Sequence, residues 1–175
     1  MKNVLIVIDM QKDFIDGSLG SPEAQAIVPK VAEKIAQYRA EGKRIIFTAD
    51  THSTQYLKNT LEGKYLPIEH CQYGTKGWEL HEAMDYDTYD AILKETFGYM
   101  HWTNLLYPQD MPNGIEICGL CTDICVVSNA LILRATFPNT KITCNASCCA
   151  GTTPERHKAA LDVMRSCQID VVNDY

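Results

Sequence analysis

The sequence has neither a long apolar run nor a cluster of basic residues. No apolar stretch approaches the roughly 18 residues that a membrane-spanning helix needs, so we expect no membrane partner. The formal net charge is -6 at pH 7, and no run of Lys or Arg offers a footprint for phosphates. We therefore expect no nucleic-acid partner. Met1-Lys2-Asn3 leads straight into an apolar run that ends in an acid, unlike a secretory signal, so we expect a cytoplasmic protein.

Cysteine is plentiful, with 8 residues, but a disulfide framework is not expected. The chain shows no secretory signal and is large enough to fold without cross-links, which favours reduced thiols. Cys118, Cys121 and Cys125 have a spacing that could suit a metal finger. The second group of cysteines, within residues 144–149, lies in an apolar strand pattern with no histidine spacing to match. We expect most of the cysteines to be packing residues.

Apolar runs alternate along the chain with segments of helical period. With 175 residues and 46% hydrophobic content, the simplest expectation is a single domain over residues 1–175. The predicted strands cover 4–8, 45–47, 91–93, 114–118, 141–144 and 169–172, and the predicted helices cover 22–41, 78–84, 99–107, 122–137 and 154–167. This alternation predicts an α/β three-layer sandwich with a mainly parallel central sheet. Residues 51–74 have little periodicity, and long irregular segments in compact domains are often functional.

The segment Cys118-Gly119-Leu120-Cys121-Thr122-Asp123-Ile124-Cys125 joins a predicted strand to a predicted helix. Thr122 or Asp123 can cap the start of that helix, which places Cys125 in its first turn. Unpaired amides and the positive end of the helix dipole favour a thiolate there. Cys125 is therefore a candidate nucleophile. The alternative is a buried cysteine that serves as a small hydrophobe, which is the commoner case for an arbitrary cysteine.

Four successive predicted strands end in groups that can do chemistry. Asp9, Asp50 and Lys94 end the first three strands, and the turn that carries Cys125 follows the fourth. Ligands of parallel sheets bind beyond the carboxyl ends of the strands, so we expect these groups to meet. Taken alone, Asp9 would be read as a turn cap and Lys94 as a solvated strand end.

Together these groups outline an amidase that works through a thioester. The ammonium of Lys94 would favour the Cys125 thiolate. Asp9 could accept the thiol proton and pass it to a departing amine. Backbone amides of Cys121 and Cys125 could hold an oxyanion.

A second group of residues has the composition of a metal site. Asp50 and His52 lie two residues apart on an extended segment, so their side chains point to the same side. His70 adds a second imidazole and Glu62 a second carboxylate. This ligand set suits zinc, iron or manganese, and the sequence does not choose among them. His52 could instead cap a turn, and for Glu62 a solvated surface position is an almost equal alternative.

These residues resemble the isochorismatase-like cysteine hydrolases, and within them the nicotinamidases, nearly end to end. The resemblance rests on segments 7–14, 48–52, 66–71, 74–77, 93–97, 119–125 and 153–157. It implies the isochorismatase-like fold, a catalytic triad of Asp9, Lys94 and Cys125, and a cis peptide bond between Leu120 and Cys121.

The resemblance also implies how a substrate and a metal would be held. One divalent ion (zinc, iron or manganese) would be bound by Asp50, His52 and His70, with Glu62 as the best candidate for a fourth ligand. The pyridine nitrogen of nicotinamide approaches that metal in the family. The residues that match the walls around the ring are Phe14, Phe97 and Leu120.

Departures from the family pattern leave the exact amide open. Nicotinamidases often have an aromatic residue where this chain has Leu66, and Phe97 stands where a tyrosine is frequent. Isochorismatases proper lack the nucleophilic cysteine, so Cys125 argues against that activity. Carbamoyl and ureido hydrolases of this fold generally lack the Asp-x-His pair, so Asp50 and His52 argue against them.

We therefore expect a metal-dependent cysteine amidohydrolase that acts on a small-molecule amide. The first choice is a nicotinamidase, which converts nicotinamide and water to nicotinate and ammonia and would serve NAD salvage. The alternatives are a related amidase for another small amide and a non-catalytic metal or thiol redox sensor. A homo-oligomer is compatible with the sequence, which does not reveal the oligomeric state.

Overall fold

The computed structural model describes residues 3–106 and 112–174 of the chain. Within these residues a 6-stranded sheet has the order β3-β2-β1-β4-β5-β6, and every pair of neighbouring strands is parallel. The strands are β1 (Val4–Ile8), β2 (Arg44–Asp50), β3 (Ile92–Lys94), β4 (Gly114–Leu120), β5 (Lys141–Ala150) and β6 (Asp170–Val172). The predicted α/β fold with a parallel central sheet is confirmed.

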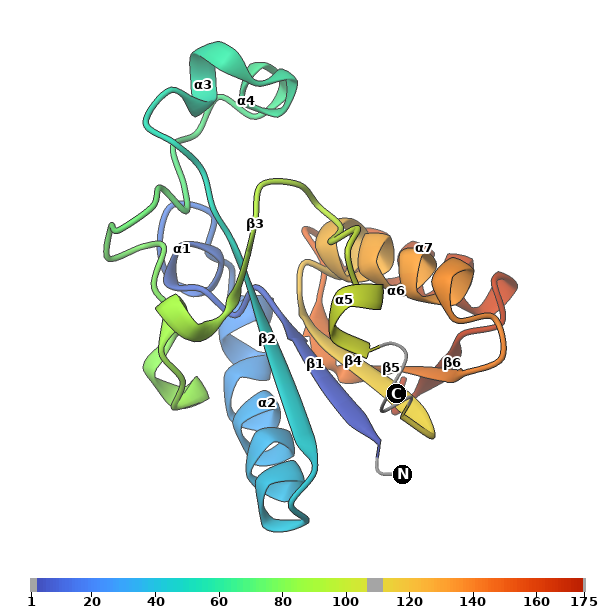
Figure 1. The fold of residues 1–175 in the computed structure, drawn as a ribbon. Helices are drawn as coiled ribbons and strands as arrows, with labels where there is room; N and C mark the ends of the chain where they lie inside the picture. The colour runs from blue at the N-terminus through green and yellow to red at the C-terminus, as the bar shows by residue number, and fades with distance from the viewer. Residues whose placement is uncertain (1–2, 107–111, 175) are drawn as a thin grey trace.

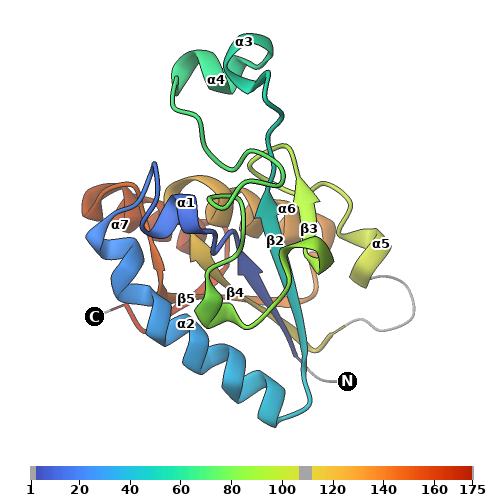
Figure 2. The ribbon, with the colours of Figure 1, turned by 90° about the vertical axis from the view of Figure 1, so that its left-hand side faces the viewer.

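Helices cover both faces of this sheet. Helix α2 (Pro22–Ala40) lies on one face, and α6 (Val127–Thr136) and α7 (Pro154–Ser166) lie on the other (Figures 1 and 2). The N-cap hydroxyls Ser21 and Thr153 accept hydrogen bonds from the first turns of α2 and α7, and a proline follows each cap. The shorter helices are α1 (Lys12–Ile15), α3 (Tyr56–Asn59), α4 (Leu61–Tyr65), α5 (Thr103–Leu106) and the 3₁₀ turns η1 (Glu82–Met84) and η2 (Thr88–Asp90).

The core forms around the central strands β1 and β4. Every residue of β1 is buried because helices cover both faces of the sheet, as its continuous aliphatic sequence predicts. Gly119 in β4 has a φ of 121°, and a Cβ at this position would collide with the backbone of Ile8. The glycine therefore allows the end of β4 to approach the end of β1, where Asp9 follows.

Several predicted elements differ from the structure in their bounds or type. Residues 78–81 are not helical, because their backbone groups form hydrogen bonds with the segment at α1 instead. Lys12 N–H donates to Glu79 O, and Gln11 forms a β-bridge with Leu80. The helix predicted over 99–107 begins at Thr103, and its predicted end at residue 107 lies outside the described residues. Strand β5 extends beyond the predicted 141–144 to Ala150, after a register shift against β4.

The segment predicted to be irregular, 51–74, contains the two short helices α3 and α4. Together with their connection they form the α3–α4 lobe (residues 55–66), which stands out from the body at one edge (Figures 1 and 2). Thr60 caps α4 by accepting a hydrogen bond from Gly63 N, 2.9 Å away. Helices of this length are too short to show a periodicity in the sequence. No helix in the described part of the chain combines the length and apolar character needed to cross a bilayer.

Candidate active site

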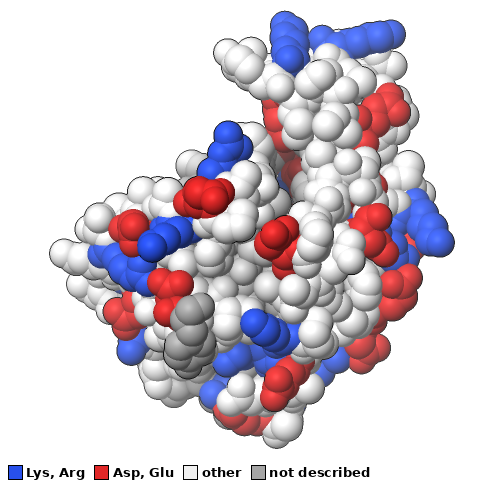
Figure 3. All heavy atoms as spheres, turned by 180° about the vertical axis from the view of Figure 1, so that it is seen from behind, with Lys and Arg blue, Asp and Glu red and all other residues white. Residues whose placement is uncertain are grey.

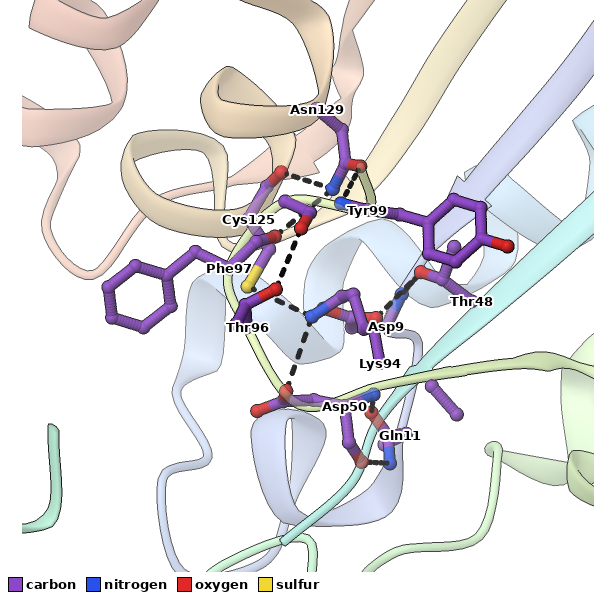
Figure 4. A network of polar contacts seen from close by, with 12 residues as sticks. Asp9, Gln11, Thr48, Asp50, Lys94, Thr96, Phe97, Tyr99, Cys125 and Asn129 are labelled. Atoms are coloured by element: carbon purple, nitrogen blue, oxygen red, sulfur yellow. Dashed lines mark hydrogen bonds and ion pairs between the residues drawn. The ribbon is translucent and has the colours of Figure 1, made fainter. Parts of the chain in front are cut away.

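The carboxyl edge of the sheet brings Asp9, Asp50, Lys94 and Cys125 together. Asp50 and Lys94 are paired in the register of β2 and β3, so their side chains leave the sheet on the same side. The Lys94 Nζ atom lies 2.6 Å from Asp9 Oδ2, 3.3 Å from Asp50 Oδ1 and 3.5 Å from Cys125 Sγ (Figure 4). One buried ammonium therefore contacts both carboxylates and the thiol. The roles that the sequence analysis gives these residues remain predictions.

Asp9 is held in an unusual backbone conformation. Its φ of 46° lies in the left-handed region, which residues other than glycine rarely adopt. Thr48 fixes it from β2: the Thr48 hydroxyl accepts a hydrogen bond from Asp9 N at 3.2 Å and donates one to Asp9 Oδ1 at 2.6 Å. Strained residues of this kind persist where the surroundings hold them, and they cluster at functional sites.

The four groups determine one another's protonation. Burial alone would lower the pKa of Lys94, but the nearby carboxylates raise it well above its ordinary value. Burial raises the pKa of Asp9 despite the opposing effect of Lys94. Burial also opposes the ionisation of Asp50, yet His52 and Lys94 together lower its pKa. Lys94 is therefore a firmly protonated cation at the centre of the cluster.

Cys125 differs from expectation in its ionisation. Burial raises the pKa of its thiol well above the ordinary value, and the Lys94 ammonium only partly offsets this. Burial therefore favours the neutral thiol in the free protein, whereas the sequence analysis expects a thiolate. Asp9 is close enough to accept a hydrogen bond from this thiol, which raises the pKa further. The thiol thus lies beside a carboxylate that can take its proton.

The turn that carries Cys125 is a π-helix, η3 (Thr122–Val126), in which Val126 N donates to Cys121 O at 3.1 Å. π-Helical turns are rare and occur frequently at functional sites. The predicted cap by Thr122 or Asp123 is wrong, because the N-cap is Cys121 and no side chain caps the turn. The side chains of Thr122 and Asp123 contact the start of α7 instead. The peptide bond between Leu120 and Cys121 is cis, as the resemblance implied.

Thr122 and Asp123 attach the cysteine turn to the start of α7. Thr122 Oγ1 lies 2.7 Å from His157 Nδ1. The Asp123 carboxylate accepts hydrogen bonds from the backbone N and the hydroxyl of Thr152, at 2.8 and 2.6 Å. His157 is a half-buried residue of α7 that contacts this turn.

The predicted metal ligands also converge. One ligand atom from each of Asp50, His52, Glu62 and His70 lies within 4.8 Å of the others. His52 Nε2 is 2.9 Å from Asp50 Oδ2 and 4.0 Å from Glu62 Oε1, and His70 Nε2 is 4.0 Å from Asp50 Oδ2. A short parallel bridge, His52 with Gln72, brings the two histidines together across the intervening loop. Helix α4 places Glu62 in this group, where its side chain is only partly exposed.

The chemistry of these donors fits a divalent cation. Within the described residues, the buried Nε2 atom of His52 has no hydrogen-bond partner, although the Asp50 carboxylate is adjacent. His70 Nδ1 lies 2.8 Å from Ile68 O, a contact that assigns the proton to Nδ1 and leaves the Nε2 lone pair directed at the group. Burial and the neighbouring Asp50 raise the pKa of Glu62. A bound cation would offset the repulsion between the two carboxylates.

A cavity of about 860 Å³ lies beside these groups. Asp50, Glu62 and His70 line one part of it and Cys125 another. The predicted substrate-binding residues also line it: Phe14, Phe97 and Leu120, together with Cys121. Figure 3 shows the surface hollowed between the α3–α4 lobe and the rest of the molecule. Other lining residues, which the sequence analysis did not assign, are Leu19, Gly20, Ser21, Ala24, Leu61, Tyr65, Leu66, Glu95, Thr96, Ile124, Gly151, Thr152 and Arg156.

Two residues with buried side-chain amides, Gln11 and Asn129, fix the backbone around the site, and the sequence analysis missed both. Gln11 bonds to both backbone groups of Asp50: its Nε2 donates to Asp50 O at 2.9 Å and its Oε1 accepts from Asp50 N at 2.7 Å. Asn129 donates to Cys125 O at 2.8 Å and to Phe97 O at 3.1 Å, and accepts from Tyr99 N at 2.9 Å (Figure 4). A polar residue on the apolar face of a predicted helix was the signal that could have identified Asn129.

Known proteins resemble this chain over nearly its whole length. A family model described as the isochorismatase domain matches residues 3–173. A pyrazinamidase from Pyrococcus horikoshii, solved in complex with zinc, has a TM-score of 0.79 and 29% identity, covering 98% of this chain and 99% of its own. A nicotinamidase/pyrazinamidase from Bacillus subtilis has a TM-score of 0.81 and 24% identity, with the same coverage of 98% and 99%.

A more distant similarity involves a different substrate. Streptothricin hydrolase from Streptomyces noursei is 23% identical over 130 residues. The match covers 72% of this chain and 46% of that protein, so the chain spans about half the length of this curated relative. The two solved structures share the fold of this chain. The names of these structures and of the curated relative describe hydrolases with more than one substrate.

Proposed function

The chain belongs to the isochorismatase family of hydrolases, and on this premise we propose that it is a metal-dependent cysteine amidohydrolase whose substrate is nicotinamide. The observation that carries the proposal is the position of Lys94. Its ammonium contacts the Cys125 sulfur, the Asp9 carboxylate and Asp50 of the metal-binding group. The nucleophile and the group that would bind the ring therefore lie within one substrate length.

In the first half of the reaction, Asp9 accepts the thiol proton of Cys125 as the sulfur attacks the carboxamide carbon. The carbon–sulfur bond forms, and backbone amides of Cys121 and Cys125 hold the developing oxyanion. Asp9 then delivers its proton to the nitrogen as the carbon–nitrogen bond breaks and ammonia leaves. The high pKa of Lys94 keeps a positive charge beside the sulfur throughout this exchange.

In the second half, water takes the place of the departed ammonia. Asp9 accepts a proton from this water, which attacks the thioester carbon. The carbon–sulfur bond breaks, nicotinate leaves, and the thiol of Cys125 is restored with the proton from Asp9. Each step needs one group that takes and returns a proton, and burial raises the pKa of Asp9 toward the range in which it can do both.

Asp50, His52, His70 and Glu62 would hold the divalent ion, for which zinc, iron and manganese are all suitable. When bound, such an ion would act as a Lewis acid that accepts the pyridine nitrogen of the substrate. Phe14, buried with its ring 5.7 Å from the His70 ring, and Leu120 would form walls against the substrate ring. Phe97 is partly exposed at the mouth of the cavity.

A substrate panel tests the proposal. We expect ammonia release from nicotinamide with a kcat/KM at least roughly 100-fold higher than from benzamide or a short aliphatic amide, since neither offers a ring nitrogen to the metal group. The measurement is a coupled ammonia assay on the metal-loaded protein. Equal rates for nicotinamide and benzamide would contradict the assigned substrate, and no release from any amide would contradict the assigned reaction.

A thiol sensor is less well supported by the same residues. A sensor needs accessible cysteines of low pKa. Burial raises the pKa of the Cys121 thiol to about 12 and that of the Cys71, Cys118 and Cys148 thiols above their ordinary value. None of these thiols has the ionisation that reactive sensing requires.

A further inference from the structure

The cavity continues past Cys125, away from the metal-binding group. Asp50 lies at the end of β2, the turn of Cys125 follows β4, and Gly151 and Thr152 follow β5. In the sheet order β2-β1-β4-β5, neighbouring strands lie about 4.8 Å apart, so the lining spans roughly 14 Å along the edge. Cavities of this size enclose drug-sized ligands, whereas nicotinamide is a single ring with one carboxamide. Nicotinamide would therefore leave the β5 end of the cavity unfilled.

This end, which we call the β5 arm, is lined by apolar side chains and ends at a cation. Leu19, Ala24 and Ile124 contribute apolar surface to the lining. Arg156, in the first turn of α7, is exposed at the rim, and its Nη1 lies 3.3 Å from the Thr152 hydroxyl. Of the carboxylates in the described residues, none lies within ion-pair distance of this guanidinium, and Asp123 is already bound by Thr152.

We propose that the β5 arm binds the leaving-group side of an N-substituted amide. The substrate class is an aromatic carboxamide whose nitrogen carries an apolar chain that ends in a carboxylate. This proposal rests on the proposed function and extends it. The same thioester forms, the carbon–nitrogen bond breaks, and the nitrogen takes the proton from Asp9, so the product is an ω-amino acid in place of ammonia. Water then releases the aromatic acid as before.

The order of groups along the sheet edge assigns the arm to the leaving group. With the ring at Asp50 and the reacting carbon at Cys125, the acyl side of the substrate occupies the β2 end of the cavity. The bond that breaks then points away from the ring, toward β5. Apolar walls favour methylene groups along the arm, and the guanidinium of Arg156 favours a carboxylate at its end.

The test compares nicotinamide with N-(ω-carboxyalkyl)nicotinamides of increasing chain length. We expect kcat/KM to rise roughly two- to fourfold for each methylene that the arm buries, until the carboxylate reaches Arg156. Arg156→Gln should lower kcat/KM for the best chain length roughly fivefold more than for nicotinamide. Lys158→Gln is the matched control, since it removes an equal charge from the exposed side of the same helix and should change neither rate.

A binding measurement tests the β5 arm independently of the hydrolysis reaction. Calorimetric titration of Cys125→Ala protein should show tighter binding of the extended amide than of nicotinamide, and the difference should shrink in the Cys125→Ala, Arg156→Gln double variant. If nicotinamide is hydrolysed but the extended amides neither bind more tightly nor react, the β5 arm proposal is overturned and the proposed function stands. If neither amide binds or reacts, both are overturned. If affinity and kcat/KM rise with chain length but Arg156→Gln does not alter the rise, the assignment of Arg156 as the partner of the substrate carboxylate is overturned.

Discussion

Cys125→Ala protein is expected to lose turnover of nicotinamide by roughly 10⁴-fold or more. The substitution removes the atom that forms the thioester, and no other described thiol lies in contact with Lys94. Asp9 and Lys94 would remain paired in this variant. The Asp9 carboxylate could then activate water for direct attack on the amide, but only weakly, because no covalent intermediate forms. Ammonia release, followed over long incubations at high enzyme concentration, measures the residual rate.

Folding should survive this change. Cys125 is 4% exposed, and removing its sulfur atom to leave the methyl side chain of alanine creates only a small void, so the free energy of unfolding should change by about 1 kcal/mol or less. Cys148→Ala is the matched control, because it truncates another buried thiol, in β5, and should retain full turnover. Substantial turnover by folded Cys125→Ala protein would remove Cys125 from the mechanism.

Lys94→Met is expected to damage both stability and turnover. The Lys94 side chain is 1% exposed, and its removal leaves the buried Asp9 and Asp50 carboxylates without their shared cation. Breaking a buried ion pair in this way typically costs about 3–5 kcal/mol. Turnover should fall at least roughly 100-fold, because the positive charge beside the sulfur is lost and Asp9 is no longer held as a carboxylate. Chemical denaturation and the ammonia assay provide the two readouts.

Another lysine in a β-strand, Lys141, provides the matched comparison for Lys94→Met. Lys141 in β5 also pairs with an aspartate, Asp170, at 3.1 Å, but its side chain is 68% exposed. Exposed pairs contribute little, so Lys141→Met should change the free energy of unfolding by less than about 1 kcal/mol and leave turnover intact. Equal stability losses at the two positions would show that burial of the Lys94 cluster has no special energetic importance.

The convergence of the site at one sheet edge was predictable, because strand ends are visible in the sequence. The aliphatic run before Asp9 and the apolar run before Gly119 identify buried parallel strands. Their carboxyl ends must then share one edge. The pairing of Asp50 with Lys94 follows from register, which the sequence does not reveal but the sheet enforces. The sequence therefore indicated which groups meet, and the structure supplied their distances.

Features that depend on tertiary contacts were not predictable in the same way. Glu62 joins the metal-binding group because helix α4, too short to show a period, is capped by Thr60. The raised pKa of the Cys125 thiol results from burial, which outweighs the local effects that the sequence suggests. Thr122 looked like a helix cap, but it contacts His157 on a distant helix. In each case long-range packing decided between alternatives that were locally similar.

The most direct test of the central claim is ammonia release after removal and return of the metal. The protein is dialysed against a chelator, assayed with nicotinamide and with benzamide, and assayed again after zinc, iron or manganese is added back. We expect kcat/KM for nicotinamide to fall at least roughly 100-fold on chelation and to recover on reloading, while the low rate with benzamide changes little. Full activity of metal-free protein on nicotinamide would contradict the account.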